Sequence, residues 1–132
     1  MPASERPQTG LEQTVVTVHS SNGAHRFKVD IARTFAQQER GLMFVRKLPG
    51  DRGMIFPYDP PQEVAFWMKN TLIPLDMIFI RPDGKIARVA TAKALDETPV
   101  PSGEITAVVF EIRGGRADEL GIRAGDTVDW PH

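Results

Sequence analysis

The sequence contains no cysteine among its 132 residues. Disulfide bonds, thiolate nucleophiles and cysteine-ligated metal sites are therefore excluded. An excess of one charge is also missing, because 16 basic residues balance 17 acidic ones and the net charge is −1. Nucleic acids and anionic membranes bind clustered lysine and arginine, so neither is expected as a partner. No apolar run is long enough to span a bilayer, so no transmembrane segment is expected.

The start of the chain has little apolar character. MPASERPQTGLEQ is polar and lacks the apolar central region of a signal peptide. We expect residues 1–13 to form a flexible lead and residues 14–132 to form one β-rich domain, a length that suits a single core. The same start would result if a leader had been removed, so the residues allow either a cytoplasmic or an exported protein.

Short strand-like segments separated by turn residues dominate the chain. Segment 14–31 predicts a β-hairpin, because β-branched residues precede a turn at Asn22 and Gly23 and alternation follows it. EITAVVFEIR is apolar on both faces and predicts a covered central strand. PYDPPQ predicts a proline-broken loop. About seven or eight short strands indicate a mainly β, antiparallel sandwich or barrel.

One segment, near residues 34–43, has a helical pattern. Thr34 is a good N-cap residue and Gln37 stands three positions later, as in a capping box. Gly41 is a poor interior helix residue, so it either ends the helix or allows another backbone to approach. Three apolar residues recur at helical spacing and should share one face, namely Phe35, Leu42 and Met43.

FWMKNTLIPLD, residues 66–76, places polar residues inside an apolar run. Strand alternation puts Asp76 at one end of an apolar row and Glu111 at the end of another. A buried carboxylate is costly unless it is paired and hydrogen-bonded. Lys69 and nearby arginines are candidate partners, and the Asn70 amide supplies two donors and an acceptor.

Two interpretations of these residues stay open. The functional one is a small-ligand pocket with apolar walls and a few polar groups. Its candidate ligand-binding residues are Trp67, Lys69, Asn70, Thr71 and Asp76. In the structural one, Asp76 and Asn70 bond to the backbone of the bend before Pro74. Lys69 then extends past Trp67 into water, and Glu111 lies near the surface at a strand end.

Other constellations carry less weight. The three histidines lack metal-ligand spacing, so we expect no metal and no cofactor. Four aromatic residues would suit a stacking platform for a sugar or a base, but core packing is the more common role of such residues. They are Phe56, Tyr58, Phe66 and Trp67.

Six segments occur in a characteristic order and spacing, namely ARTFAQQERGLMF, GMIFPY, FWMKNTLIPLDMIFI, DGKI, VFEIRGG and LGIRAGDTV. From about Val18 to Val128 the chain thereby resembles domain of unknown function 192, a widespread family of small prokaryotic proteins. The resemblance implies a compact, mainly β, jelly-roll-like fold with one helix packed on it. Members often carry a signal peptide or lipoprotein leader, which implies a periplasmic, envelope or exported location.

The resemblance supplies no catalytic residues, so the site within residues 67–76, including Pro74, is our own hypothesis. The first function that fits is a binding module for a small polar ligand, a saccharide or a peptide end. The second is an acid–base hydrolase or lyase that uses Asp76 or Glu111, with Lys69 as electrostatic stabiliser. The third is an envelope structural or partner-binding protein in which the motif serves the fold.

Overall fold

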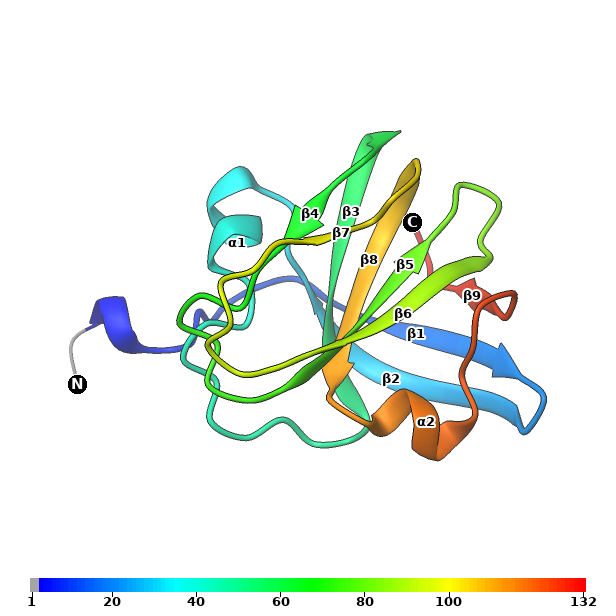
Figure 1. Ribbon diagram of the computed structural model, residues 1–132, viewed down its shortest axis with the longest axis horizontal. Coiled ribbons are helices and arrows are strands. Elements are labelled where there is room, and N and C mark those ends of the chain that lie inside the picture. The colour runs from blue at the N-terminus through cyan, green and yellow to red at the C-terminus, as the bar shows by residue number, and fades with distance from the viewer. Residues whose placement is uncertain (1–2) are drawn as a thin grey trace.

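The computed structural model describes residues 3–132, and its fold is mainly β, which confirms the predicted fold class (Figure 1). Two α-helices, α1 (Phe35–Arg40) and α2 (Arg116–Leu120), and the 3₁₀ turn η1 (Ala3–Glu5) are short. The strands are β1 (Gln13–Ser20), β2 (Gly23–Ile31), β3 (Arg52–Gln62), β4 (Ala65–Phe66), β5 (Leu75–Ile80), β6 (Ile86–Ala92), β7 (Val100–Pro101), β8 (Thr106–Arg113) and β9 (Thr127–Asp129).

Seven strands form one sheet in the order β6-β5-β8-β3-β2-β1-β9, and β4 pairs with β7 in a second, small sheet. Every neighbouring pair is antiparallel except β2 and β3, which are parallel. Parallel neighbours need a crossover, and the connection that contains α1 supplies it. The sheet is therefore mixed rather than wholly antiparallel, and the jelly-roll-like arrangement is not confirmed.

The main sheet of the described chain is not a closed barrel, but its two ends meet. Lys85, just before β6, forms an isolated antiparallel bridge with Thr127 of β9. Backbone hydrogen bonds on either side join Ile86 to Asp126 and Val128 to Gly84. As a result β9 is bonded to β1 on one side and to the start of β6 on the other.

The structure corrects the prediction of a loop at PYDPPQ. Strand β3 continues through residues 57–62, and its pairing with β8 shifts register between Pro57 and Gln62. Proline cannot donate a ladder hydrogen bond, so it is tolerated in a strand where the ladder is interrupted. Three prolines therefore fit the irregular end of this strand.

Helix α1 begins with the predicted capping box. The Thr34 hydroxyl accepts from the Gln37 amide at 3.1 Å, and the Gln37 side chain accepts from the Thr34 amide at 3.1 Å. Gly41 ends the helix with φ 49°. The predicted apolar face is wrong for Phe35, which is 83% exposed. Leu42 lies beyond the helix, so helical spacing does not relate the two positions.

Two apolar clusters lie on opposite faces of the main sheet, because alternate residues of each central strand belong to different clusters. The α2-side cluster includes Ile78, Phe110 and Ala117. The α1-side cluster includes Met77 and Val109 of the same two strands. Both faces of β5 and β8 are therefore covered, as the apolar pattern of β8 predicted.

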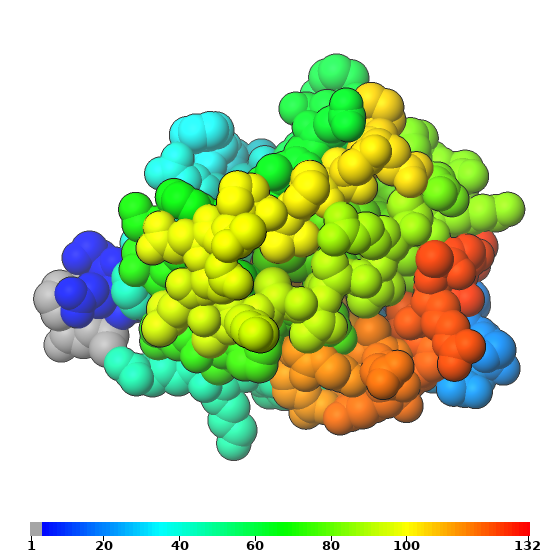
Figure 2. Space-filling model, in the orientation of Figure 1, coloured from blue at the N-terminus to red at the C-terminus, as the bar shows by residue number. Residues whose placement is uncertain are grey.

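The segment around β7 covers part of the α1-side cluster. Val100 and Phe66, from the two strands of the small sheet, pack against it. Figure 2 shows this segment in yellow, spread over the surface beside the green residues around β4. No helix of the described chain is long and apolar enough to cross a membrane.

Candidate functional site

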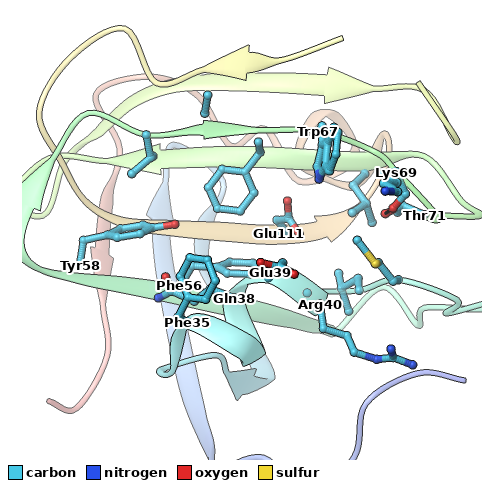
Figure 3. Close-up of a pocket in the computed structure, with 17 residues that line it drawn as sticks. Phe35, Gln38, Glu39, Arg40, Phe56, Tyr58, Trp67, Lys69, Thr71 and Glu111 are labelled. Atoms are coloured by element: carbon cyan, nitrogen blue, oxygen red, sulfur yellow. Dashed lines mark hydrogen bonds between the residues drawn. The ribbon is translucent and has the colours of Figure 1, made fainter. Parts of the chain in front are cut away.

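An open cavity of about 330 Å³ lies on the α1 side of the main sheet (Figure 3). Helix α1 and the loop after it form one wall, and the segment from Val64 to Thr71 forms the opposite wall. Strand β3 contributes Phe56 and Tyr58, and β8 contributes Glu111. Leu75 of β5 lines it as well, so the cavity is built from residues spread along the chain from Phe35 to Glu111.

A tight turn after β4 sets the wall that carries the FWMKN motif. The Thr71 amide donates to the Met68 carbonyl at 3.1 Å, and Asn70 adopts φ 54°, which asparagine tolerates better than most residues. Met68 is buried, whereas Trp67 and Lys69 are exposed. Burial of the residue between them directs Trp67 and Lys69 to the cavity rim.

Glu111 is the most unusual residue of the cavity. Its side chain lies between Met54 of β3 and Met77 of β5 in the sheet register, and the residue is only 3% exposed. No described residue donates a hydrogen bond to its carboxyl, whose oxygens open onto the cavity. Burial raises the pKa of Glu111 to about 8. Glu111 is therefore a largely protonated acid at neutral pH.

The position of Glu111 differs from the expected surface position at a strand end. It occupies the sixth of the eight positions of β8, which runs from Thr106 to Arg113. Helix α1 and the 64–71 segment cover this face of the strand, so the Glu111 carboxyl is enclosed although its own strand continues for two more residues.

Tyr58 adds a hydroxyl group to the same cavity. In Figure 3 its ring lies at one end of the cavity, with the oxygen directed inward. Burial, and then the charge of Glu111, raise the pKa of Tyr58 above its ordinary range. The phenol therefore stays protonated and able to donate a hydrogen bond.

The positive groups at the rim rest on aromatic rings. The Lys69 ammonium lies 5.2 Å from the Trp67 ring centroid, and the Arg40 guanidinium lies 5.5 Å from that of Phe44. Arg40 also donates to the Arg6 carbonyl. Lys69 thus extends along Trp67 at the surface, as the structural interpretation predicted.

Asp76 lies on the opposite face of the sheet. In the ladder between β5 and β8, Asp76 pairs with Ile112 and Met77 pairs with Glu111, so the two carboxyls point to different sides. Asp76 is 1% exposed and belongs to the face covered by α2. The structure therefore places the two candidate carboxyls on opposite sides of the sheet, and only Glu111 lines the cavity.

Three donors satisfy the Asp76 carboxylate. Its Oδ1 accepts from the Thr91 hydroxyl at 2.7 Å and from the Gly115 amide at 3.1 Å. Its Oδ2 accepts from the Ala117 amide at 2.9 Å. Asp76 therefore ties down the start of α2, whereas the structural interpretation had assigned it to the bend before Pro74.

Of the sequence-derived site residues, Trp67, Lys69, Thr71 and Glu111 line the cavity, while Asn70, Pro74 and Asp76 do not. Asn70 supports the turn, since its carbonyl accepts from the Phe44 amide at 2.9 Å. Sequence reasoning missed the contribution of α1 to the cavity, and it considered Tyr58 only for an aromatic platform or the core. The capping box located the helix, but no local signal placed it beside Glu111. Within residues 3–132, no three side chains are grouped to hold a metal ion.

Comparison with known proteins identifies relatives of this fold. The family model for domain of unknown function 192, described as an uncharacterised ACR, matches residues 16–130. A crystal structure of a protein of unknown function from Novosphingobium aromaticivorans DSM 12444 is 44% identical, with a TM-score of 0.90 over 98% of both chains. A crystal structure from Sinorhizobium meliloti 1021, named as a candidate transcription regulator, is 34% identical, with a TM-score of 0.89 over 93% of this chain and 97% of that one. No curated protein matches.

Proposed function

We propose that this chain, which belongs to the family of domain of unknown function 192, is a binding module whose site is the cavity at Glu111. The ligand would be a small polar molecule, a saccharide or the end of a peptide. A cavity of about 330 Å³ has the size of a small-molecule site. Its apolar walls and few polar groups are typical of such sites.

The observation that carries this proposal is the unpaired carboxyl of Glu111. Burying a polar group without a hydrogen-bond partner costs about 1–3 kcal/mol. An apolar residue at this position of β8 would avoid that cost. A carboxyl that is buried, lacks an internal donor and opens onto a cavity is explained if a ligand supplies its partner.

Five of the cavity residues have a role in this proposal. Glu111 fixes the orientation of the ligand's polar group at the cavity floor, and the Tyr58 hydroxyl supplies a second polar contact. Trp67 forms an apolar wall on which a sugar or peptide surface can stack. Lys69 and Thr71 meet the part of the ligand that extends to the rim.

A melting-temperature screen tests the proposal. Wild-type protein is mixed with panels of metabolites, glycans and short peptides, because a ligand that binds only the folded state raises the melting temperature. We expect at least one compound to raise it, and expect Trp67→Ala and Glu111→Gln to reduce that rise. Glu97→Gln, an exposed carboxyl outside the cavity, is the matched control. A screen without any shift, or a shift that neither cavity variant reduces, would refute the proposal.

One observation favours a second function, acid–base catalysis. A carboxyl with a pKa of about 8 can exchange a proton near neutral pH, as a general acid or base must. Glu111 is then the acid–base group and Lys69 the electrostatic stabiliser, since Asp76 is on the other face. NMR titration of the Glu111 carboxyl tests this alternative, and an ordinary acidic pKa would remove it.

A further inference from the structure

Resting on the proposed function, we infer that the cavity binds an organic ammonium ion, a small amine whose charged nitrogen meets the Glu111 carboxyl among aromatic rings. The size of the cavity alone leaves the charge of the ligand open. An ammonium ligand is indicated by the unpaired carboxyl, by the position of the protein's own cations and by the rings around the cavity.

The Glu111 carboxyl lacks a hydrogen-bond donor within the described chain. Glu111 is only 3% exposed, and no described group donates a hydrogen bond to its carboxyl oxygens. A carboxylate only accepts hydrogen bonds, and its strongest partners are cationic N–H groups. A primary ammonium offers three such donors and a compensating charge, so it satisfies this group more completely than a neutral hydroxyl.

The cationic side chains at the cavity do not pair with Glu111. The charged or titratable residues that line the cavity with Glu111 are Tyr58 from β3, Glu39 and Arg40 from α1, and Lys69 from the opposite wall. Burial alone accounts for the raised pKa of Glu111, with no offset from a neighbouring positive charge. Lys69 and Arg40 instead rest on Trp67 and Phe44.

Aromatic rings line much of the cavity around Glu111. Phe56 and Phe66 meet edge to face, with ring centroids 4.9 Å apart and planes at 81°. Phe35, Tyr58 and Trp67 line the cavity as well. The faces of such rings attract a cation, and Trp67 already holds one in Lys69. Rings around a buried carboxylate therefore suit an amine better than an anion.

A distinctive pH dependence follows from this chemistry. An ammonium ligand requires ionised Glu111, so its binding below pH 8 releases one proton from the carboxyl. Its affinity should rise about tenfold per pH unit below the pKa of Glu111, about 8, and level off above it. A neutral ligand that accepts from the protonated carboxyl would show the opposite trend. Tyr58 does not interfere, because its pKa lies well above this range.

Calorimetric titration with three probes of one skeleton tests the inference. The probes are 2-phenylethylamine, 2-phenylethanol and 3-phenylpropionate, which differ in charge but keep similar shape. We expect wild-type protein to bind the amine at least tenfold more tightly than either other probe at pH 8. We also expect amine affinity to fall about tenfold from pH 7 to pH 6, with proton release visible in buffers of different ionisation enthalpy. These wild-type measurements need no variant to fold.

Two variants locate the effect. Glu111→Gln should lose at least tenfold in amine affinity at pH 8, whereas Glu97→Gln, which removes an exposed carboxyl elsewhere, should bind as wild type does. If the alcohol or the propionate binds through Glu111 and the amine does not, the inferred charge is wrong while the proposed binding function stands. If none of the probes binds, the ammonium inference is overturned, and the wider ligand panel alone decides the proposed function.

Discussion

Asp76 and Glu111 are two buried carboxyls on adjacent strands of one sheet, and they occupy opposite faces of it. Their exposures are nearly equal, at 1% and 3%. Asp76 accepts three hydrogen bonds and holds the start of α2. Glu111 accepts none from the described residues and opens onto a cavity. Equal burial thus accompanies two different roles, and the number of donors distinguishes them.

Burial alone does not identify the role of a carboxyl in this protein. A satisfied carboxylate such as Asp76 stabilises the fold because its donors compensate for lost hydration. An unsatisfied one such as Glu111 costs stability, and the proposed binding site would account for that cost at the cavity. The difference between the two residues can be measured as opposite changes in the free energy of unfolding.

The largest expected effect is that of Asp76→Ala. The substitution leaves two backbone amides and the Thr91 hydroxyl without their acceptor at the buried start of α2. We expect the free energy of unfolding to fall by roughly 3–5 kcal/mol, measured by urea denaturation. Asp118→Asn, an exposed residue of the same helix, is the control and should change it by less than about 0.5 kcal/mol. If both variants lost the same free energy of unfolding, Asp76 would not be a stabilising carboxylate and would no longer differ from Glu111.

Glu111→Gln should act in the opposite direction. Folding raises the pKa of Glu111 from 4.5 to about 8, so the folded state binds more protons between these values and loses stability as pH rises through them. Glutamine does not titrate and avoids this loss. As pH rises from 4.5 to 8.5, we expect the free energy of unfolding of the variant to gain about 2 kcal/mol on that of wild type. This gain is smaller than the upper bound set by the pKa shift, which is about 1.4 kcal/mol per pKa unit.

Urea denaturation of both proteins at the two pH values measures this gain. Other titrating groups contribute equally to wild type and variant, so their effects cancel in the difference. A constant difference across the pH range would show that Glu111 ionises normally, and it would then no longer contrast with Asp76.

The smallest expected effect is that of Lys69→Met. The Lys69 ammonium rests on an exposed Trp67 ring, and such a contact contributes about 0.5–1 kcal/mol at most at the surface. Methionine keeps the apolar part of that contact, so we expect a loss of less than about 0.5 kcal/mol in urea denaturation. A loss of several kcal/mol would instead identify Lys69 as a partner of a buried carboxylate.

Local features of the fold could be predicted from the sequence. The capping box at Thr34 and Gln37 and the hairpin that turns at Asn22 and Gly23 were both expected, because each depends on a few neighbouring residues. The parallel pairing of β2 with β3 was not predicted. It depends on the path of the chain through α1, and residue patterns within either strand do not encode that path.

The cavity could be predicted only in part. The polar motif drew attention to Trp67, Lys69 and Thr71, which do line it. The faces of Asp76 and Glu111 could not be related, since they depend on the register between β5 and β8. Strands that are apolar on both faces do not specify that register through alternation, and a shift by one residue reverses every side chain.

The bridge between Lys85 and Thr127 has a consequence for self-association. The unpaired edge of a β-sheet is a template on which strands of other molecules can add, and such addition leads to aggregation. Because β9 is bonded to β1 on one side and to residues 84–86 on the other, this three-residue strand shields both ends of the sheet where they meet. Loss of β9 would uncover the edge of β1 at residues 17–19 and the backbone of residues 84–86 at once, which would leave both open to pairing with other molecules.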